Sequence, residues 1–463
     1  MKKTILIVYL LLYIILFSIN AGANDQDILV ISEKFINYLQ NGQFIEAARL
    51  CEEKSEELRL NWKDITDNFG DLINYQMEKN KSKSNTVEAT LAFEKQTVYM
   101  TFFFNEDNII ISTQIDVNPY VEDSIYSKKY IRENKGKVLV QTPEVFELTN
   151  IILVMTDFGI KDPTYFNKRG VYYNQIIKHF TKYRNHPLFT KINFSRENMF
   201  NYLALRSNSL AYHFNEDKIV KNEVYFKIMA NEIFLENIDL IEDFAKVSNF
   251  RSFYNKNKEV YNTAIQLYKT TIPVEQMWVW LEEQFPIKYD TYKIIISPVR
   301  SPTNNTYRLV QAGFKKCFMF VPSIGSADIG SLEEALLSRA LFTEVVHNYV
   351  NPTTDKYRSN VNSAIKNIKK WNKQKYHYYQ SPYATFNEYV TWGTFLLYAY
   401  DHYEQDLFLK VKERVVRQMT FNRAFIRFDH FADFYLELYQ NRGNKKISDL
   451  YPEIITWFAS YSI

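Results

Sequence analysis

The spacing of hydrophobic residues changes within the first 116 residues of the chain. Between residues 28 and 60 the hydrophobic positions recur every three or four residues, with a break at Asn41-Gly42, and this pattern predicts two short helices. Hydrophobic and polar residues then alternate over residues 86–93, 97–104 and 109–115, which is typical of antiparallel strands. We therefore predict a small domain over residues 24–116, in which helices precede a curved antiparallel sheet.

Residues 117–142 are charged and contain Asn118-Pro119, and we interpret them as a linker with an edge strand at residues 137–141. Helical spacing dominates from Pro143 onward, until three apolar runs predict strands. The predicted helices are residues 143–155, 172–182, 198–214, 223–230, 238–247, 259–269 and 274–285, and the predicted strands are residues 292–298, 307–312 and 317–321. The predicted fold class is α+β, and the second domain, residues 143–463, is larger and mostly helical with a short sheet.

The first residues have the order of a secretory signal. Lys2 and Lys3 precede an apolar run over residues 5–17, and Ala21-Gly22-Ala23 provides small residues for cleavage. A membrane anchor is the alternative, but residues 4–19 are short for a span of about 20 residues. We predict that residues 1–23 are a cleaved signal peptide, that no membrane span remains, and that the protein is secreted to the periplasm or cell envelope.

The net charge argues against nucleic-acid binding, and the spacing of the glycines argues against a nucleotide-binding phosphate loop. The formal net charge is +3, and it falls to +1 when Lys2 and Lys3 leave with the signal, so the basic excess that nucleic-acid binding needs is absent. The 11 glycines never lie closer than five residues apart. The closest pair, Gly325 and Gly330, has the spacing of a phosphate-binding loop, but Ser331 stands where that loop requires lysine.

The two cysteines, Cys51 and Cys317, fall in different predicted domains, and we interpret them as core thiols.

The segment that carries candidate chemistry begins with Ser331 and Glu334, which have the spacing of a capping box. We predict a helix from Leu332 to about Val350, ended by Asn351-Pro352. Within this helix, Thr343-Glu344-Val345-Val346-His347 matches the zinc signature His-Glu-x-x-His in every position except the first. In that signature two histidines one turn apart bind the metal, and the glutamate acts as general base on the bound water. Thr343 replaces the first histidine, and its hydroxyl is a poor substitute for imidazole.

A third ligand is predicted on a later helix. Asn387-Glu388 follows a turn at Ser381-Pro382, and Glu388 is the candidate ligand. His377 and His402 are candidate replacements for the missing histidine, although we favour a structural role for both. The lysine-rich residues 366–375 fit either a flap over a substrate or a solvated helix face, and we favour the helix face.

The order of strand, capped helix, His347-Asn348-Tyr349-Val350-Asn351-Pro352 and Asn387-Glu388 helix resembles a zincin-like family of secreted bacterial proteins, catalogued as a domain of unknown function. The resemblance covers residues 143–402. In that family the helix reads His-Glu-x-x-His-x-Phe-Val-Asn-Pro, which implies a zinc-dependent hydrolase of the Glu-zincin branch. The resemblance implies that Glu344 is the base, and that His347 and Glu388 are metal ligands. Thr343 departs from the family pattern and marks the missing ligand.

Residues 25–116 resemble small cystatin-like, nuclear-transport-factor-like domains. The resemblance rests on Asn41-Gly42-Gln43-Phe44, on Trp62 with Phe69-Gly70, and on the hairpin at residues 102–109. Domains of this type imply a ligand-sized concavity inside a curved sheet. For this domain we favour a role in binding or spacing over catalysis.

Three functions remain open on the sequence. The first is a catalytically impaired or inactive metallopeptidase-like domain that acts by binding a peptide or protein ligand, with zinc weakly bound or absent. The second is an active zinc metallohydrolase that uses a replacement ligand. The third is a structural or ligand-binding protein of the envelope, and the sequence does not predict an oligomeric state.

Overall fold

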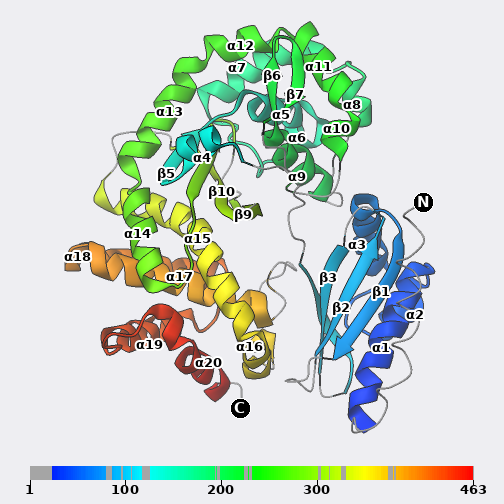
Figure 1. The fold of residues 1–463 in the computed structure, drawn as a ribbon, viewed down its shortest axis with the longest axis vertical. Coiled ribbons are helices and arrows are strands. Elements are labelled where there is room, and N and C mark those ends of the chain that lie inside the picture. The colour runs from blue at the N-terminus through cyan, green and yellow to red at the C-terminus, as the bar shows by residue number, and fades with distance from the viewer. Residues whose placement is uncertain are drawn as a thin grey trace. The chain divides into compact units, whose positions relative to one another are not determined.

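The chain forms two compact units (Figure 1). One holds most of the residues up to Asp116, and the other contains Val117–Ile463. The predicted α+β class is confirmed, with an antiparallel sheet near the N-terminus and a larger, mostly helical part after it. This computed structural model describes residues 23–79, 86–94, 97–105, 107–116, 126–192, 194, 199–223, 228, 232–300, 304–311, 313–324, 330–365, 367–373, 379 and 382–461. The predicted signal peptide therefore lies, except for Ala23, outside the described residues.

The N-terminal unit pairs three helices with a four-stranded sheet of order β1-β2-β3-β4. Burial alternates along β2, as the sequence pattern predicts, and Phe35 of α1 packs edge-on against Phe102 of β3 with ring centroids 5.9 Å apart. Strand β1 was not predicted, although Ile73, Tyr75 and Met77 alternate with polar residues along it. The elements are α1 (Ala23–Gln40), α2 (Phe44–Ala48), α3 (Ser55–Phe69), β1 (Leu72–Lys79), β2 (Thr86–Phe93), β3 (Thr97–Phe104) and β4 (Ile110–Asp116).

The first part of the larger unit is a group of helices around its own apolar core. Most of the predicted helices are present, whereas the predicted helix at residues 223–230 lies largely outside the described residues. The elements are α4 (Lys128–Asn134), β5 (Lys137–Gln141), α5 (Glu144–Met155), α6 (Asp157–Lys161), α7 (Val171–Phe180), η1 (Thr181–Tyr183), α8 (Leu188–Lys191), α9 (Met199–Asn208), η2 (Ser209–Ala211), β6 (Tyr212–Asn215), β7 (Lys218–Lys221), α10 (Ile233–Glu236), α11 (Ile238–Val247), α12 (Phe250–Lys256), α13 (Lys258–Thr271) and α14 (Val274–Gln284).

A second four-stranded sheet has the order β5-β8-β10-β9. Strand β8 (Thr291–Ser297) pairs in parallel with β5 and with β10 (Phe314–Pro322), whereas β9 (Asn305–Gln311) pairs antiparallel with β10 and forms an edge. The edge strand predicted at residues 137–141 is confirmed as β5. Because β5 and α4 lie within residues 117–142, much of the predicted linker is part of the folded unit.

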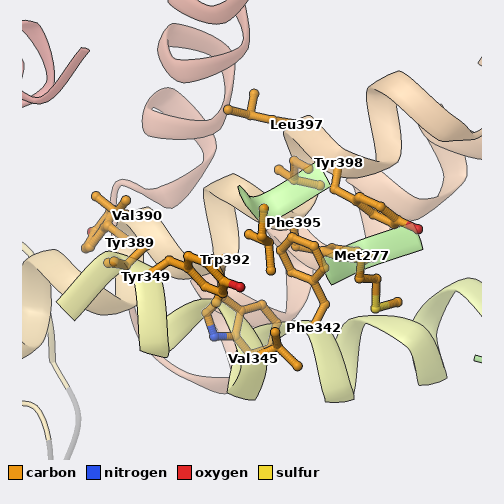
Figure 2. Packing of buried hydrophobic residues seen from close by; sticks show 14 of the residues in the cluster. Met277, Phe342, Val345, Tyr349, Tyr389, Val390, Trp392, Phe395, Leu397 and Tyr398 are labelled. Carbon is orange, nitrogen blue, oxygen red and sulfur yellow. The ribbon is translucent and has the colours of Figure 1, made fainter. Parts of the chain in front are cut away.

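The C-terminal helices pack around α17, which is buried along nearly its whole length. Figure 2 shows Phe342 and Val345 of α15 in one cluster with Phe395 and Tyr398 of α17. None of the helices that the structure describes is long and apolar enough to cross a membrane. The elements are α15 (Ser331–Lys356), α16 (Arg358–Ala364), η3 (Ile368–Lys370), α17 (Pro382–His402), α18 (Gln405–Arg417), η5 (Gln418–Asn422), α19 (Phe428–Gln440), η6 (Ile447–Leu450) and α20 (Tyr451–Ser460).

Close packing between α17 and α19 depends on Gly393. A Cβ atom at this position would lie 2.6 Å from Cδ1 of Tyr435 and 2.8 Å from Cε1 of Phe431, which is closer than van der Waals contact allows. The absence of a side chain therefore lets the two helices approach, and α17 is held in a fixed position beside α15.

Both predicted ends of the α15 helix differ from the structure. The helix starts at Ser331, its N-cap is Gly330, and no side chain caps it, so the predicted capping box is wrong. The helix also continues through Pro352 to Lys356, so the predicted stop at Asn351-Pro352 is wrong. Proline cannot donate a hydrogen bond to the carbonyl four residues earlier, which is that of Asn348. The hydroxyl of Tyr289 donates to that carbonyl at 2.6 Å and replaces the missing bond.

We expect Tyr289→Phe to lower the free energy of unfolding by about 1–2 kcal/mol, because the buried Asn348 carbonyl loses its donor. In a Pro352→Ala background the same change should cost less, since the amide at position 352 can then donate to that carbonyl. Urea unfolding of the two single variants and the double variant measures the coupling. Equal costs in both backgrounds would contradict the compensation.

Candidate functional site

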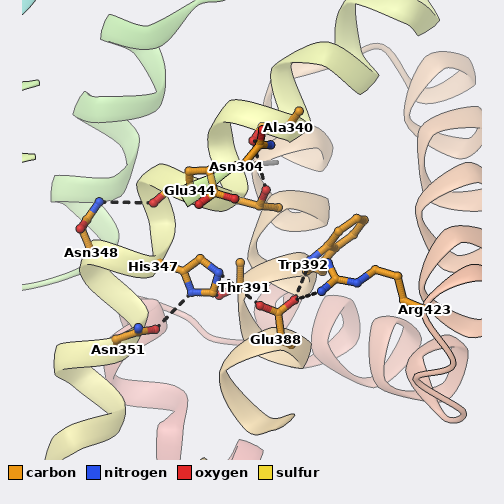
Figure 3. A network of polar contacts seen from close by, with 11 residues as sticks. Asn304, Ala340, Glu344, His347, Asn348, Asn351, Glu388, Thr391, Trp392 and Arg423 are labelled. Atoms are coloured by element: carbon orange, nitrogen blue, oxygen red, sulfur yellow. Dashed lines mark hydrogen bonds and ion pairs between the residues drawn. The ribbon is translucent and has the colours of Figure 1, made fainter. Parts of the chain in front are cut away.

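Two neighbouring helices bring three of the predicted site residues together (Figure 3). Helix α15 carries Glu344 and His347, and α17 carries Glu388. The Nε2 atom of His347 lies 3.3 Å from Oε1 of Glu388, and Glu388 is only 3 % exposed. The predicted convergence of His347 and Glu388 is thus present in the structure.

Thr343 stands one helical turn before His347 and shares its face of α15. The side chain is buried, and its hydroxyl donates to the backbone carbonyl of Ala340 at 3.3 Å. The hydroxyl is therefore hydrogen-bonded to its own helix, and position 343 provides no nitrogen that could ligate a metal beside His347.

A cation that the sequence analysis missed occupies the other side of Glu388. Nη2 of Arg423 lies 2.8 Å from Oε2 of Glu388, and the indole Nε1 of Trp392 donates to the same oxygen at 3.2 Å (Figure 3). Arg423 directly follows η5, a single π-helical turn at the end of α18. No sequence motif includes Arg423, because this residue lies after a later helix and meets Glu388 only in the folded chain.

The electrostatics of His347 and Glu388 depend on each other. Burial disfavours the charged imidazole, but the hydrogen bond to Glu388 and the charges of Glu388 and Glu344 outweigh it and raise the pKa of His347 above its usual value. Burial also acts against the charged form of Glu388, but Arg423 and His347 lower its pKa below the usual range. The pair therefore favours an imidazolium beside a carboxylate. Thr391 and Asn351 orient the ring, with Oγ1 and Oδ1 at 3.3 and 3.2 Å from its Nδ1.

The pKa of Glu344 is shifted in the opposite direction to that of Glu388. Burial, reinforced by the negative charge of Glu388, raises its pKa to about 7, although His347, Arg300 and Arg423 act in the opposite direction. Near neutral pH the carboxyl of Glu344 is therefore present in both protonation states. Such a group can accept or donate a proton, which is compatible with the role of base that the resemblance implies.

The site does not fit a resident zinc ion. Two zinc ligands at about 2.0–2.2 Å in tetrahedral geometry lie about 3.4 Å apart, and His347 Nε2 and Glu388 Oε1 have this separation. However, the second oxygen of Glu388 is engaged by Arg423 and Trp392, and Thr343 offers no third donor. Within the described part of the chain, no group of three or more His, Cys, Asp or Glu side chains is placed to hold a metal.

The candidate replacement ligands do not add a donor. Nδ1 of His402 bonds to the carbonyl of Tyr398 at 2.9 Å, and the ring stacks on that of Tyr398 with centroids 4.3 Å apart. His377 lies outside the described residues. In the lysine-rich segment, Lys369 and Lys370 are exposed and Trp371 is fully buried, but the described residues form only the short 3-10 turn η3 and not the predicted helix.

Comparison with protein-family models, with curated proteins and with solved structures finds no match to this chain.

A second buried carboxyl, not singled out by the sequence, lies in α5. Glu147 is fully buried, and the hydroxyl of Tyr172 donates to its Oε1 at 2.8 Å. A further hydroxyl contact joins Tyr172 to Tyr261, with 2.6 Å between the oxygens. Burial raises the pKa of Glu147 to about 7, against the opposing effects of the Ser297 hydroxyl and of the hydrogen bond from Tyr172.

We expect the Arg423→Met substitution to lower the free energy of unfolding by about 3 kcal/mol, because it leaves the Glu388 carboxylate buried without its cation. Adding Glu388→Gln should recover part of the loss, since a neutral amide needs no cation. Urea unfolding of the double-variant cycle measures the coupling. Lys412→Met, which removes the exposed 2.6 Å pair with Asp433, is the matched control and should cost less than about 1 kcal/mol. Strictly additive losses at positions 423 and 388 would argue against the network.

We expect Glu147→Gln to stabilise the protein at pH 8 by about 1–3 kcal/mol. The folded-state pKa is raised from 4.5 to about 7, so the wild-type protein binds a proton on folding between these values and loses stability as pH rises through them. The difference between variant and wild type should therefore shrink toward pH 4.5. Unfolding curves at several pH values test this, with the exposed Glu413→Gln as control. A difference independent of pH would disprove the assignment.

Proposed function

We propose that the larger unit is a zincin-like, metallopeptidase-related domain that has lost zinc-dependent catalysis and acts by binding a peptide or protein ligand. The observation that carries the proposal is the ion pair between Arg423 and Glu388, at 2.8 Å. Through it, a side chain of the protein supplies the positive charge that a metal would otherwise supply beside Glu388. The absence of the first histidine, at Thr343, would weaken metal binding, and Arg423 would make a metal unnecessary for neutralising Glu388, so both features support the same proposal.

The arrangement around β9 supports a peptide as the ligand. Strand β9 is the edge of its sheet, and edge strands present unpaired backbone groups to which an extended peptide can add. The start of β9 is held against α15. Nδ2 of Asn304, which precedes the strand, donates to the carbonyl of Ala340 at 3.2 Å, and Asn348 Nδ2 donates to Oγ1 of Thr306 at 2.9 Å. A peptide along β9 would pass close to the turn of α15 that carries Glu344.

The order of charged, apolar and small residues in positions 1–23 supports export, so we place the proposed binding function outside the cytoplasm, in the periplasm or cell envelope. The competing proposal, an active zinc metallohydrolase, is the alternative outcome of the experiment below.

We expect the mature wild-type protein to contain no stoichiometric zinc and to hydrolyse no peptide in a mixed casein-peptide assay. Thr343→His should tighten zinc binding by at least about tenfold, because it restores the missing nitrogen ligand. The Arg423→Met change should strengthen this gain, since it frees the second oxygen of Glu388. Metal analysis and zinc titration measure both effects, and Glu388→Gln in the Thr343→His background is the control that should abolish them. Stoichiometric zinc with hydrolysis in the wild-type protein would refute the proposal.

A further inference from the structure

Arg339 lies on the same face of α15 as the candidate site, one helical turn before Thr343. Its guanidinium carbon is 4.4 Å from the centre of the Trp392 ring. The guanidinium carbon of Arg423 lies 4.9 Å from the centre of the same ring. Two cations therefore stack on one indole, and that indole also bonds to Glu388.

The two arginines differ in their partners. Arg423 is neutralised by Glu388, whereas Arg339 forms no ion pair with any residue that the structure describes. Nε of Arg339 is buried and has no hydrogen-bond acceptor among these residues. Burial, together with the charge of Arg423, lowers the pKa of Arg339 to about 10, so the side chain stays charged at neutral pH. The guanidinium group of Arg339 is thus charged and oriented by stacking on Trp392, and its Nε donor is not used by the described residues.

A second, independent observation shows the same excess of positive charge. Arg206 of α9 and Arg300, which follows β8, are 1 % and 2 % exposed, and both donate to Oδ1 of Asn305, at 3.1 and 2.8 Å. Nε and Nη1 of Arg206 have no acceptor in the described part of the chain. Arg206 is thus a buried cation whose hydrogen-bond acceptor among the described residues is a neutral amide oxygen, an arrangement that an additional anion would stabilise.

This arginine pair lies beside the candidate site. Asn305 is the residue between Asn304 and Thr306, both of which are hydrogen-bonded to α15. Burial and a neighbouring arginine lower the pKa of both Arg300 and Arg339, and the charge of Glu344 acts in the opposite direction on both. Glu344 therefore lies among the guanidinium groups of Arg300, Arg339 and Arg423.

We propose that the site recognises a ligand carboxylate through Arg339, so that the bound peptide carries an acidic side chain or a free C-terminus at this position. The inference rests on the proposed binding function and specifies its ligand class. The planar guanidinium group matches a carboxylate with two parallel hydrogen bonds, and its stacking on Trp392 fixes the plane in advance. The uncompensated charge of Arg206 favours an anionic ligand over a neutral or cationic one.

The probes are acetylated, amidated alanine pentapeptides with glutamate or glutamine at the centre, and pentaalanine with a free or an amidated C-terminus. Isothermal titration calorimetry with chelator present should give at least about tenfold tighter binding for a peptide with a carboxylate than for its neutral partner. The two pairs distinguish a side-chain carboxylate from a terminal one. Arg339→Met should reduce the ratio to near one, and Arg339→Lys should leave an intermediate ratio because it keeps the charge and loses the fork.

The exposed Arg414→Met is the matched control and should keep the wild-type ratio. Circular dichroism and thermal unfolding establish that each variant is folded. Equal affinity for charged and neutral peptides, an unchanged ratio in Arg339→Met, or no binding of any probe at millimolar concentration would each overturn the inference. Because the titrations contain chelator, they measure the carboxylate preference without zinc. Zinc-dependent hydrolysis in the separate assay of the wild-type protein would refute the proposed function, and the affinity ratios would still test the carboxylate preference.

Discussion

The buried carboxylate of Glu388 is the constraint on which the site depends. Packing of α17 against α15 and α19 carries this side chain into the interior, where an uncompensated negative charge would cost several kcal/mol. His347, Trp392 and Arg423 each supply a hydrogen to it, from α15, from α17 and from the end of α18. The same carboxylate thus links three elements, so the candidate site and the packing of the C-terminal helices depend on the same charged contacts.

An internal cation differs from a metal in ways that matter for binding. A metal ion exchanges with solution, and its affinity depends on pH because its ligands must be deprotonated. A guanidinium group is part of the chain and stays charged over the whole physiological pH range. It also stacks on an aromatic face, as Arg423 does on Trp392, and so orients this indole in addition to neutralising Glu388. The geometry of such a site does not depend on metal supply.

The sequence predicted what short-range patterns encode. Periodicity predicted most helices and the edge strand β5, and one imperfect motif with a later Asn-Glu pair predicted that His347 and Glu388 meet. It did not predict the contacts of long side chains from distant elements, because Arg423 and Arg339 belong to no motif. It also failed where the structure compensates for a local signal: Tyr289 supplies the bond that Pro352 cannot make. The β6–β7 hairpin was not predicted either. Its turn places Glu216 at a positive φ of 50°, where the usual turn signal would be a glycine.

The parallel pairing of β5 with β8 has a consequence for how the larger unit forms. Oγ1 of Thr291 donates to the carbonyl of Lys137 at 2.9 Å, although these residues are 154 positions apart. Helices α5 to α14 lie between the two strands in the chain, and much of this segment has its own apolar core. Contacts of such long range slow folding unless the intervening chain becomes compact first. We therefore expect the helical segment to assemble before the sheet, so that formation of these helices limits the rate at which the β9 edge takes shape.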